Sequence, residues 1–287
     1  MSTVLRGKAT ADALDLDTSA RVEALKAKGI SPCLAILRVG EREDDLAYER
    51  GALKRAEKNG VAVRQVLLPE DVTQDALLAA IEDLNADDAV HGVLMFRPLP
   101  KHLDENEACE ALAPEKDVDG ITRGSMASIY AGKGAGFAPC TAESCIEILK
   151  YNNIELSGKR AVVIGRSLVI GKPVAMLLMQ NNATVTVCHS RTKDMPSVVK
   201  EADIVIAALG RAEMITADYF VPGQVVLDVG INWSEEKGKL VGDVAFDEVE
   251  PIVEAITPVP GGVGSGTTAC LVRHVVEAAE KAAGTAK

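Results

Sequence analysis

Short apolar runs alternate along this chain with longer segments whose apolar residues recur at helical spacing. Unbroken apolar runs are typical of strands buried on both faces. Strands separated by segments long enough for a crossover helix favour a parallel, doubly wound sheet. The pattern therefore predicts an α/β protein. The expected strands are Cys33–Arg38, Val61–Leu68, Val90–Phe96, Ala161–Ile164, Ala183–Val187, Asp203–Ala208 and Gln224–Val229.

Helical segments are expected between these strands and at both ends of the chain. Gly60 follows one of them at the position where a left-handed residue ends a helix. The expected helices are a lead within residues 2–30, residues 46–59, 75–85, 105–112, 141–151 and 267–283, and one that begins near residue 174.

A domain boundary is expected near residue 140, because the βα units before it lack a Gly-rich phosphate turn. We predict a substrate domain over residues 1–140 and a Rossmann-type nucleotide domain over residues 141–267. The last helix comes too late to belong to the second sheet. We therefore expect about residues 268–287 to pack back on the first domain.

The turn after the strand 161–164 is the main candidate binding element. Gly165, Arg166 and Ser167 break the apolar run, and Gly171 precedes the next helix. Unpaired backbone N–H groups and the helix dipole make such a turn an anion site. The glycine spacing differs from G-x-G-x-x-G, so the motif by itself also fits a βα turn that binds nothing.

The residues after the next strand bear on the type of dinucleotide. An NAD site favours a carboxylate there for the ribose 2′-hydroxyl, whereas a basic residue accommodates a 2′-phosphate. This chain has Ser190 and Arg191 and no acidic residue before Asp194. The pattern favours NADP over NAD.

Composition excludes several classes of protein. The net charge is −11 with a pI near 5, and no Lys or Arg run stands out, which argues against nucleic-acid and anionic-membrane partners. No segment resembles a membrane span or a signal peptide. The six cysteines form no C-x-x-C pair and the four histidines lack metal-ligand spacing, so no metal site is predicted. Reduced thiols favour a cytoplasmic protein.

Several motifs occur in order along nearly the whole chain: PEKDVDG (114–120), PCT (139–141), VIGRS (163–167), DVGIN (228–232), VGDV (241–244) and ITPVPGGVG (256–264). In these motifs the chain resembles the methylenetetrahydrofolate dehydrogenase/methenyltetrahydrofolate cyclohydrolase family. The resemblance implies NADP-dependent oxidation of methylenetetrahydrofolate to methenyltetrahydrofolate, and in most members hydrolysis to 10-formyltetrahydrofolate. It also implies a folate substrate, a catalytic first domain and a homodimer.

The resemblance assigns candidate residues to each ligand. Asp119 is expected to accept N–H bonds from the pterin, and Tyr48 to stack on it; these two are the candidate catalytic residues. On the residues alone, Asp119 also fits a turn and Tyr48 a half-buried helix aromatic. The expected cofactor-binding residues are Gly165, Arg166, Ser167, Ser190, Arg191 and Ile231, and further substrate-binding residues are Pro260, Gly261 and Gly262.

The chain departs from its family where proton transfer is expected. The family has a Lys four residues after the Tyr, but this chain has Ala52. The family's supporting Gln is replaced by Phe96. Missing acid–base help costs about 10²–10⁴ in rate, whereas hydride transfer depends chiefly on positioning. We therefore hypothesise a dehydrogenase whose cyclohydrolase activity is weak or absent.

Three alternatives stay open at this point. One is a fully bifunctional enzyme that recruits Arg55, Arg97 or Asp45, although arginine stays protonated and is a poor general base. Another is a catalytically silent folate or nucleotide binder. The third is a different two-domain dehydrogenase of similar architecture.

Overall fold

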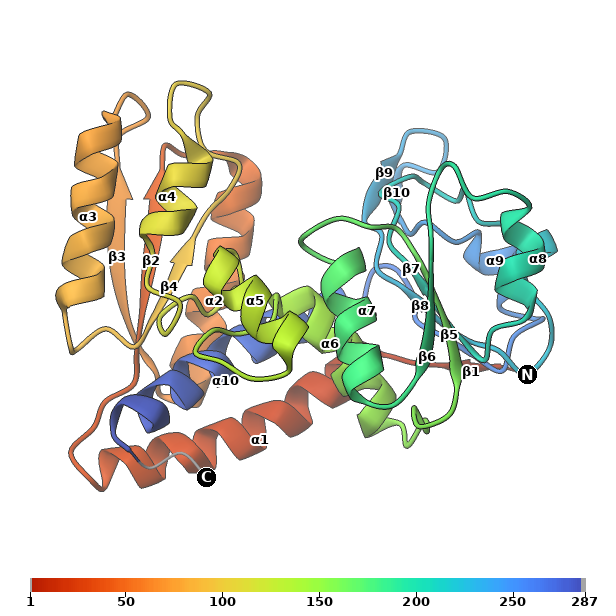
Figure 1. The fold of residues 1–287 in the computed structure, drawn as a ribbon, viewed down its shortest axis with the longest axis horizontal. Helices are drawn as coiled ribbons and strands as arrows, with labels where there is room; N and C mark the ends of the chain where they lie inside the picture. The colour runs from red at the N-terminus through yellow and green to blue at the C-terminus, as the bar shows by residue number, and fades with distance from the viewer. Residues whose placement is uncertain (1, 285–287) are drawn as a thin grey trace. The chain divides into compact units, whose positions relative to one another are not determined.

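The computed structural model describes residues 2–284, which form two compact α/β units (Figure 1). The β2 unit, named after the middle strand of its sheet, comprises residues 13–140 and 268–284. The β5 unit comprises residues 2–12 and 141–267. Helix α1 (Gly7–Lys26) begins in the β5 unit and continues in the β2 unit.

The β2 unit is built on a parallel sheet in the order β3-β2-β4. Its middle strand is buried along nearly its whole length, as its unbroken apolar run predicts. The strands are β2 (Cys33–Val39), β3 (Ala62–Leu68) and β4 (Gly92–Met95). The helices are α2 (Glu43–Asn59), α3 (Gln74–Ala86), α4 (Glu105–Ala111), α5 (Arg123–Ala131) and α10 (Gly264–Ala282).

Alternate residues of β2 face two different layers of helices. Ala35 and Leu37 pack in one core with α3 and α4, while Leu34 and Ile36 pack in another with α1, α2 and α10. The prediction that the C-terminal helix packs on the first domain is therefore confirmed, because its buried residues, such as Val275, belong to the second of these cores.

Helix α2 is held in place at its C-terminal end and by an ion pair from a residue within the helix. It ends at Gly60, whose left-handed conformation (φ +71°) confirms the predicted helix stop. A buried ion pair joins the helix to the sheet, with Arg38 Nε 2.9 Å from Glu49 Oε2. These contacts fix the helix that carries Tyr48 and Ala52.

The β5 unit contains a parallel sheet in the order β1-β11-β8-β7-β5-β6. Helices α6 and α7 pack on one face and α8 and α9 on the other, which confirms the doubly wound parallel sheet. The strands are β1 (Thr3–Val4), β5 (Arg160–Ile164), β6 (Thr184–Cys188), β7 (Ile204–Ala207), β8 (Val225–Asp228) and β11 (Ala255–Ile256). The remaining elements are α6 (Cys140–Tyr151), α7 (Gly171–Gln180), α8 (Met195–Lys200), η1 (Ala217–Tyr219), α9 (Phe246–Val249) and an antiparallel hairpin of β9 (Asn232–Ser234) and β10 (Lys239–Val241).

The structure corrects the expected boundary at the start of the chain. Residues 2–12 belong to the β5 unit and not to the domain predicted over residues 1–140. The reason is β1, in which Thr3 and Val4 pair in parallel with Ala255 and Ile256 of β11. A strand of this length carries too little pattern to be recognised in sequence.

Helix α5 was not predicted either. It buries few apolar side chains, so its periodicity is weak. Thr122 begins it by accepting a hydrogen bond from the Ser125 N–H at 3.0 Å, and Gly132 ends it in a left-handed conformation.

Candidate active site

Tyr48 and Phe96 form an aromatic pair in the β2 unit. Their ring centroids are 5.8 Å apart with an interplanar angle of 84°, an edge-to-face contact. Burial raises the pKa of the Tyr48 hydroxyl well above its ordinary value, and the nearby Asp119 carboxylate raises it further. Tyr48 therefore keeps its proton at neutral pH and presents an uncharged ring and a hydroxyl.

Asp119 lies in a turn that is fixed by Asp117. The buried Asp117 carboxylate accepts hydrogen bonds from the N–H groups of Ile121 and Thr122, at 3.0 and 2.8 Å, and from Ser125 Oγ at 2.6 Å. Next to Asp119, Gly120 adopts φ +67°, and a Cβ there would lie 2.6 Å from a backbone nitrogen of the 137–139 segment. Only glycine fits this approach.

The environment of Asp119 favours its protonated form more than water does. Burial raises the pKa of this carboxyl, and the Asp117 charge adds to the rise. Hydrogen bonds from the Cys140 thiol and backbone, together with the Arg97 charge, oppose it. The Asp119 charge in turn acts on Tyr48, so the structure brings the two candidate catalytic residues together in one unit.

The two positions that depart from the family pattern lie in the same apolar core. Ala52 is completely buried and Phe96 is 8% exposed, and both pack in the cluster shared by α2 and α10. Lys54, two residues further along α2, is exposed to solvent. No amine therefore comes from α2 at the position one turn after Tyr48.

The arginines and the acid considered as replacements have other partners. Arg55 Nη1 lies 2.7 Å from Asp15 Oδ2, and its Nε donates to Thr268. Arg97 Nη1 lies 3.6 Å from Glu105, and Asp45 lies 3.9 Å from Arg42 Nε. The remaining sequence-predicted residues lie in the β5 unit.

The turn after β5 approaches the segment after β7 closely. Gly165 has φ +130°, and a Cβ on it would lie 2.2 Å from the carbonyl oxygen of Ala208. A Cβ on Gly171 would lie 2.3 Å from the Gly165 carbonyl oxygen. Backbone at such close range, at the carboxyl ends of neighbouring parallel strands, is the arrangement by which doubly wound sheets hold a pyrophosphate.

Ser167 organises the start of α7. Its Oγ accepts hydrogen bonds from the N–H groups of Ile170 and Gly171, at 3.1 and 3.3 Å. The hydroxyl proton therefore points away from these donors and is available to a phosphate oxygen. Arg166 is exposed beside it.

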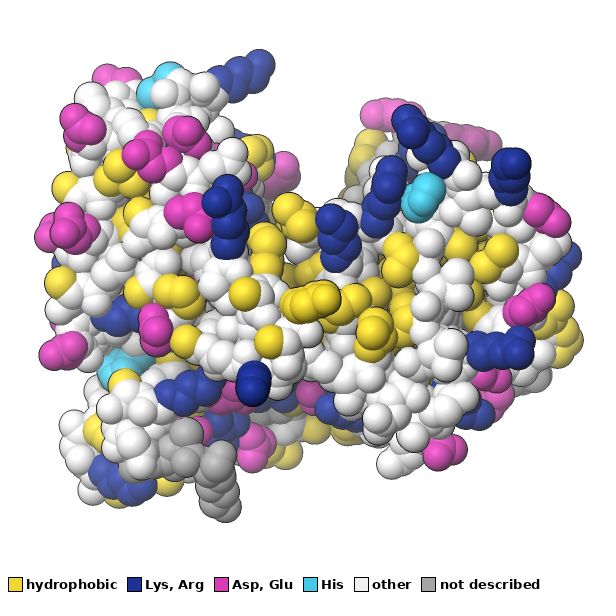
Figure 2. Space-filling view, in the orientation of Figure 1, with side chains coloured by type: hydrophobic (Ala, Val, Ile, Leu, Met, Phe, Trp, Pro, Cys, Tyr) yellow, Lys and Arg dark blue, Asp and Glu magenta, His cyan; other side chains and the backbone are white. Residues whose placement is uncertain are grey.

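Ser190 and Arg191 follow β6 and are both exposed. The strand pairs with β5 in register, Ile164 against Cys188, so the segments after the two strands lie side by side. Thr192 closes the turn by accepting from the His189 N–H at 2.9 Å. Figure 2 shows Lys and Arg side chains gathered near a histidine on the β5 unit. Residues of suitable charge for a 2′-phosphate thus lie next to the glycine turn.

A pocket of about 260 Å³ in the same unit contains both the predicted cofactor residue Ile231 and the predicted substrate residues. The pocket is lined by residues after β8 and after β11, among them Asp228, Ile231, Pro260, Gly261, Gly262 and Ser265. Ile231 is 62% exposed, as a residue that packs on a ligand would be. A Cβ on Gly262 would lie 2.4 Å from the Pro258 carbonyl oxygen, which explains the need for glycine in this loop.

Two buried acids that sequence reasoning did not single out lie at this loop: Asp228 lines the pocket, and Asp243 donates its backbone N–H to Asp228. Asp228 accepts hydrogen bonds from the N–H groups of Gly230, Asp243 and Val244, at 3.1, 2.9 and 2.9 Å. Burial raises the pKa of Asp228 to about 7, and the Asp243 charge contributes to the rise. Both acids stand in motifs, DVGIN and VGDV, so their positions were visible in the sequence but their structural role was not.

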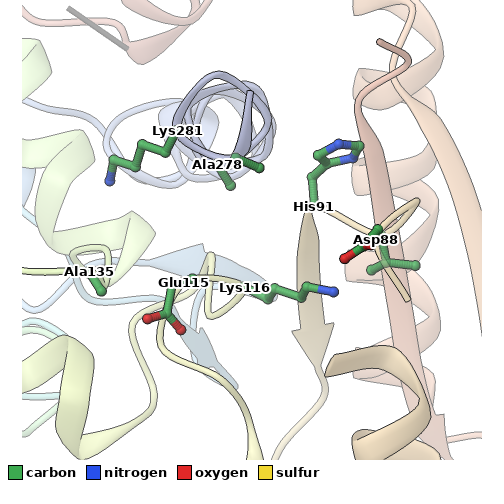
Figure 3. Close-up of a pocket in the computed structure, with 9 residues that line it drawn as sticks. Asp88, His91, Glu115, Lys116, Ala135, Ala278 and Lys281 are labelled. Carbon is green, nitrogen blue, oxygen red and sulfur yellow. The ribbon is translucent and has the colours of Figure 1, made fainter. Parts of the chain in front are cut away.

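A second cavity, of about 380 Å³, contains none of the predicted site residues. Figure 3 shows Ala278 and Lys281 of α10 on one side of it and Glu115 and Lys116 on the other. His91, which also lines it, directly precedes β4. The cavity therefore lies at the amino end of the sheet, whereas parallel sheets bind ligands at the carboxyl ends of their strands.

The described residues hold no group of three or more His, Cys, Asp and Glu side chains arranged to bind a metal ion. Between residues 2 and 284, none of the helices combines the length and the apolar character that a membrane span requires.

Fold and site together define a two-domain α/β protein with a Rossmann-type dinucleotide unit, and comparison with known proteins specifies the family. Residues 5–119 match the catalytic domain of tetrahydrofolate dehydrogenase/cyclohydrolase, and residues 139–283 match its NAD(P)-binding domain. The chain therefore belongs to the tetrahydrofolate dehydrogenase/cyclohydrolase family, which confirms the resemblance seen in its motifs.

Individual relatives match this chain along almost its full length. The chain is 54% identical to the bifunctional protein FolD of Carboxydothermus hydrogenoformans, covering 98% of each chain. The FolD dehydrogenase/cyclohydrolase structure of Campylobacter jejuni has a TM-score of 0.94 at 40% identity, covering 98% of this chain and 99% of that one. A Trypanosoma brucei FolD structure, complexed with NADP and an inhibitor, has a TM-score of 0.90 at 35% identity, covering 98% of each chain.

Proposed function

We propose that this protein oxidises 5,10-methylenetetrahydrofolate to 5,10-methenyltetrahydrofolate with NADP, and that its cyclohydrolase activity is weak or absent. Membership of the family supports the dehydrogenase reaction. The observation that carries the second part is that Ala52 and Phe96 are both buried and apolar and belong to the core cluster against which Tyr48 packs. In this proposal the β2 unit binds folate and the β5 unit binds NADP.

The residues of the β5 unit fit NADP. The Gly165 turn offers backbone N–H groups and the Ser167 hydroxyl to the pyrophosphate, in a space that a Cβ would close. Ser190 and Arg191 would hold the 2′-phosphate by charge-assisted hydrogen bonds. Ile231 would pack on the cofactor from the neighbouring pocket. When bound, NADP supplies the acceptor for the hydride of the substrate methylene carbon.

The residues of the β2 unit would orient the folate. Asp119 accepts two N–H bonds from the aminopyrimidinone ring, and Tyr48 supports the substrate by stacking. The backbone at Pro260, Gly261 and Gly262 provides close approach in the β5 unit. Since hydride loss leaves a methenyl cation and releases no proton to a base, positioning accounts for most of the catalysis.

Hydrolysis of the methenyl cation, unlike hydride transfer, requires proton transfer. Water must add to the cation and lose a proton, and the family's Lys takes part in these proton transfers. Here the corresponding side chain is a methyl group, and Phe96 occupies the place of the supporting Gln. Arg55 is paired with Asp15, and an arginine side chain is a poor general base. The expected result is release of methenyltetrahydrofolate as product.

The main competing function is the full dehydrogenase/cyclohydrolase. The observation that favours it is the description of the 54% identical relative as bifunctional. It would require a proton-transfer group other than a Lys on α2, and Asp45, three residues before Tyr48 on that helix and with a pKa that burial raises, is the acid that could supply it. The third candidate, a silent binder, predicts NADP binding without any turnover.

Replacing Asp119 by Asn separates an enzyme from a binder. The unsubstituted protein (the parent) is expected to form NADPH from methylenetetrahydrofolate. The Asp119→Asn variant is expected to have a kcat/KM lower by roughly 10²-fold, because one pterin N–H then faces an amide donor. NADP affinity is expected to stay unchanged, because Asp119 belongs to the other unit. A parent that binds NADP but forms no NADPH would contradict the proposed dehydrogenase.

A cytoplasmic location and a homodimer remain predictions that rest on the cysteine pattern and the family resemblance. Sedimentation of the purified protein would test the second.

A further inference from the structure

His274, on α10, is a buried side chain that the proposed reaction does not use. It is 1% exposed and stacks on Phe137, with ring centroids 4.9 Å apart at 30°. Its Nδ1 lies 2.8 Å from the carbonyl oxygen of Val118. Because a carbonyl oxygen can only accept, Nδ1 must carry the proton in this contact.

A second donor reaches the same carbonyl. Cys140 Sγ lies 3.2 Å from the Val118 oxygen and 3.7 Å from His274 Nδ1. The Cys140 thiol also acts on the Asp119 carboxyl, whose pKa it lowers as a hydrogen-bond partner. The thiol has one proton, so the Val118 carbonyl and the Asp119 carboxylate compete for it.

We propose that His274 is a positioning residue for Asp119: by donating to the Val118 carbonyl, it fixes the peptide that precedes Asp119 and leaves the Cys140 thiol proton to the carboxylate. The Val118 oxygen and the Asp119 nitrogen and Cα belong to one planar peptide, so holding that oxygen restrains the backbone from which the Asp119 side chain projects. Gly120, pressed against residues 137–139, restrains the other side of the turn. The inference rests on the proposed folate role of Asp119.

Two substitutions of His274 separate positioning from packing. His274→Phe keeps the stacking partner of Phe137 but removes the donor, whereas His274→Asn keeps an N–H donor in a smaller side chain. We expect His274→Phe to raise the Kd for tetrahydrofolate and the KM for methylenetetrahydrofolate about five- to tenfold, as loss of a buried hydrogen bond does. We expect kcat to change less than KM, NADP affinity to stay the same, and His274→Asn to restore most of the folate affinity.

A matched control is His91→Phe in the second cavity. His91 Nδ1 also bonds the backbone, accepting from the Cys33 N–H at 3.2 Å, but at the amino end of the sheet. This variant is expected to lower the melting temperature without changing either folate constant. If His274→Phe fails to fold, Cys140→Ala against Cys140→Ser makes the same comparison, because serine retains a donor.

Each outcome bears on the inference. Folate constants within twofold of the parent in His274→Phe, or equal losses in the Phe and Asn variants, would overturn it in favour of a packing role. A parent that binds tetrahydrofolate but forms no NADPH would contradict the proposed dehydrogenase, while the Kd comparison would still decide the role of His274. A parent that binds no folate would overturn both.

Discussion

At the scale of single residues, Ala52 and Phe96 are apolar where the family pattern has a Lys and a Gln near Tyr48. Position 52 is completely buried, and a buried charge such as a Lys ammonium is strongly unfavourable unless it is paired and hydrogen-bonded. In this chain both the charge and its polar support are absent at these positions. The apolar pair is self-consistent, because Phe96 packs its ring on Tyr48 and fills the adjoining core.

Restoring both side chains is expected to create cyclohydrolase activity. Ala52→Lys combined with Phe96→Gln should accelerate enzymatic methenyl hydrolysis at least tenfold, toward the roughly 10²–10⁴ range of acid–base catalysis. Ala52→Met with Phe96→Gln is the matched control, since methionine has nearly the length of lysine but no amine. Equal hydrolysis rates in the two double variants would show that the amine is not the missing group.

The residues of the site differ in how far the sequence could predict them. Gly165 and Ser167 follow a strand directly, so local pattern is enough to mark them. Cys140 and His274 are separated by 134 residues in the chain, and their contact with the Val118 carbonyl depends on how α10 packs on the β2 unit. No periodicity carries that information. The same holds for Asp228 and Asp243, which are buried acids satisfied by backbone N–H groups.

At the scale of elements, the β5–α7 turn depends on the absence of a side chain at one position. Gly165 combines a left-handed φ with backbone contact to Ala208. Gly158, in the turn before β5, also has a positive φ (+75°), but no atom lies within 4 Å of the place where its Cβ would be. Comparing substitutions at the two glycines therefore distinguishes the cost of a positive φ from the cost of a steric clash with neighbouring backbone.

Alanine substitutions at the two glycines are expected to give different results. Gly165→Ala should lower the free energy of unfolding by more than about 2 kcal/mol and weaken NADP binding at least tenfold. Gly158→Ala should cost about 1 kcal/mol and leave NADP affinity unchanged. Chemical denaturation and cofactor titration measure both quantities. Equal NADP affinities in the two variants would contradict the assignment of the turn.

The loop after β8 is held by a carboxyl group whose protonation is coupled to folding. Asp228 has a pKa of about 7 in the folded protein, because burial outweighs its three hydrogen bonds from backbone N–H groups. The unfolded chain has the ordinary value of about 3.9. Between these values the folded state binds the extra proton, so stability from this group is complete below about pH 4 and is lost as the pH rises through 7.

Asp228→Asn is expected to remove this contribution. From pH 4 to pH 7 the free energy of unfolding of the parent should fall by on the order of 2–4 kcal/mol relative to the variant, at about 1.4 kcal/mol for each pKa unit. Asp194→Asn, at an exposed acid, serves as the control. Identical pH slopes in the parent and Asp228→Asn would contradict the raised pKa.

Elements were predictable where their apolar pattern is long. Strands β4, β5, β7 and β8 and most of β2 follow unbroken apolar runs, while β3 and β6 are rich in β-branched residues and were also expected. By contrast, β1 and β11 contain two residues each, and α5 buries little apolar surface. Their formation depends on pairing and capping partners elsewhere in the fold, so local sequence does not specify them.

At the scale of the whole molecule, an acidic protein carries a locally basic surface on the β5 unit, where we propose that NADP binds. The net charge is −11, yet Lys and Arg side chains gather on the β5 unit (Figure 2). A local field of this kind attracts a phosphorylated ligand although the total charge repels it. The additional 2′-phosphate of NADP should therefore contribute to affinity through Arg191.

NADP is expected to stabilise the protein more than NAD at the same concentration. At 100 times its Kd a ligand adds about 2.7 kcal/mol to the stability of the state that binds it. Arg191→Ala should reduce the shift in melting temperature with NADP and leave the smaller shift with NAD unchanged, while Lys200→Ala changes neither. Equal shifts with both cofactors in the parent would contradict selectivity for NADP.

The most direct test of the account follows the methenyl species by its absorbance when purified protein, methylenetetrahydrofolate and NADP are mixed. We predict that methenyltetrahydrofolate accumulates and then decays no faster than in a control without enzyme, because Ala52 and Phe96 replace the Lys and Gln that the family uses for the proton transfer. Decay accelerated by the enzyme, at a rate comparable with hydride transfer, would contradict this account and show that the protein is fully bifunctional.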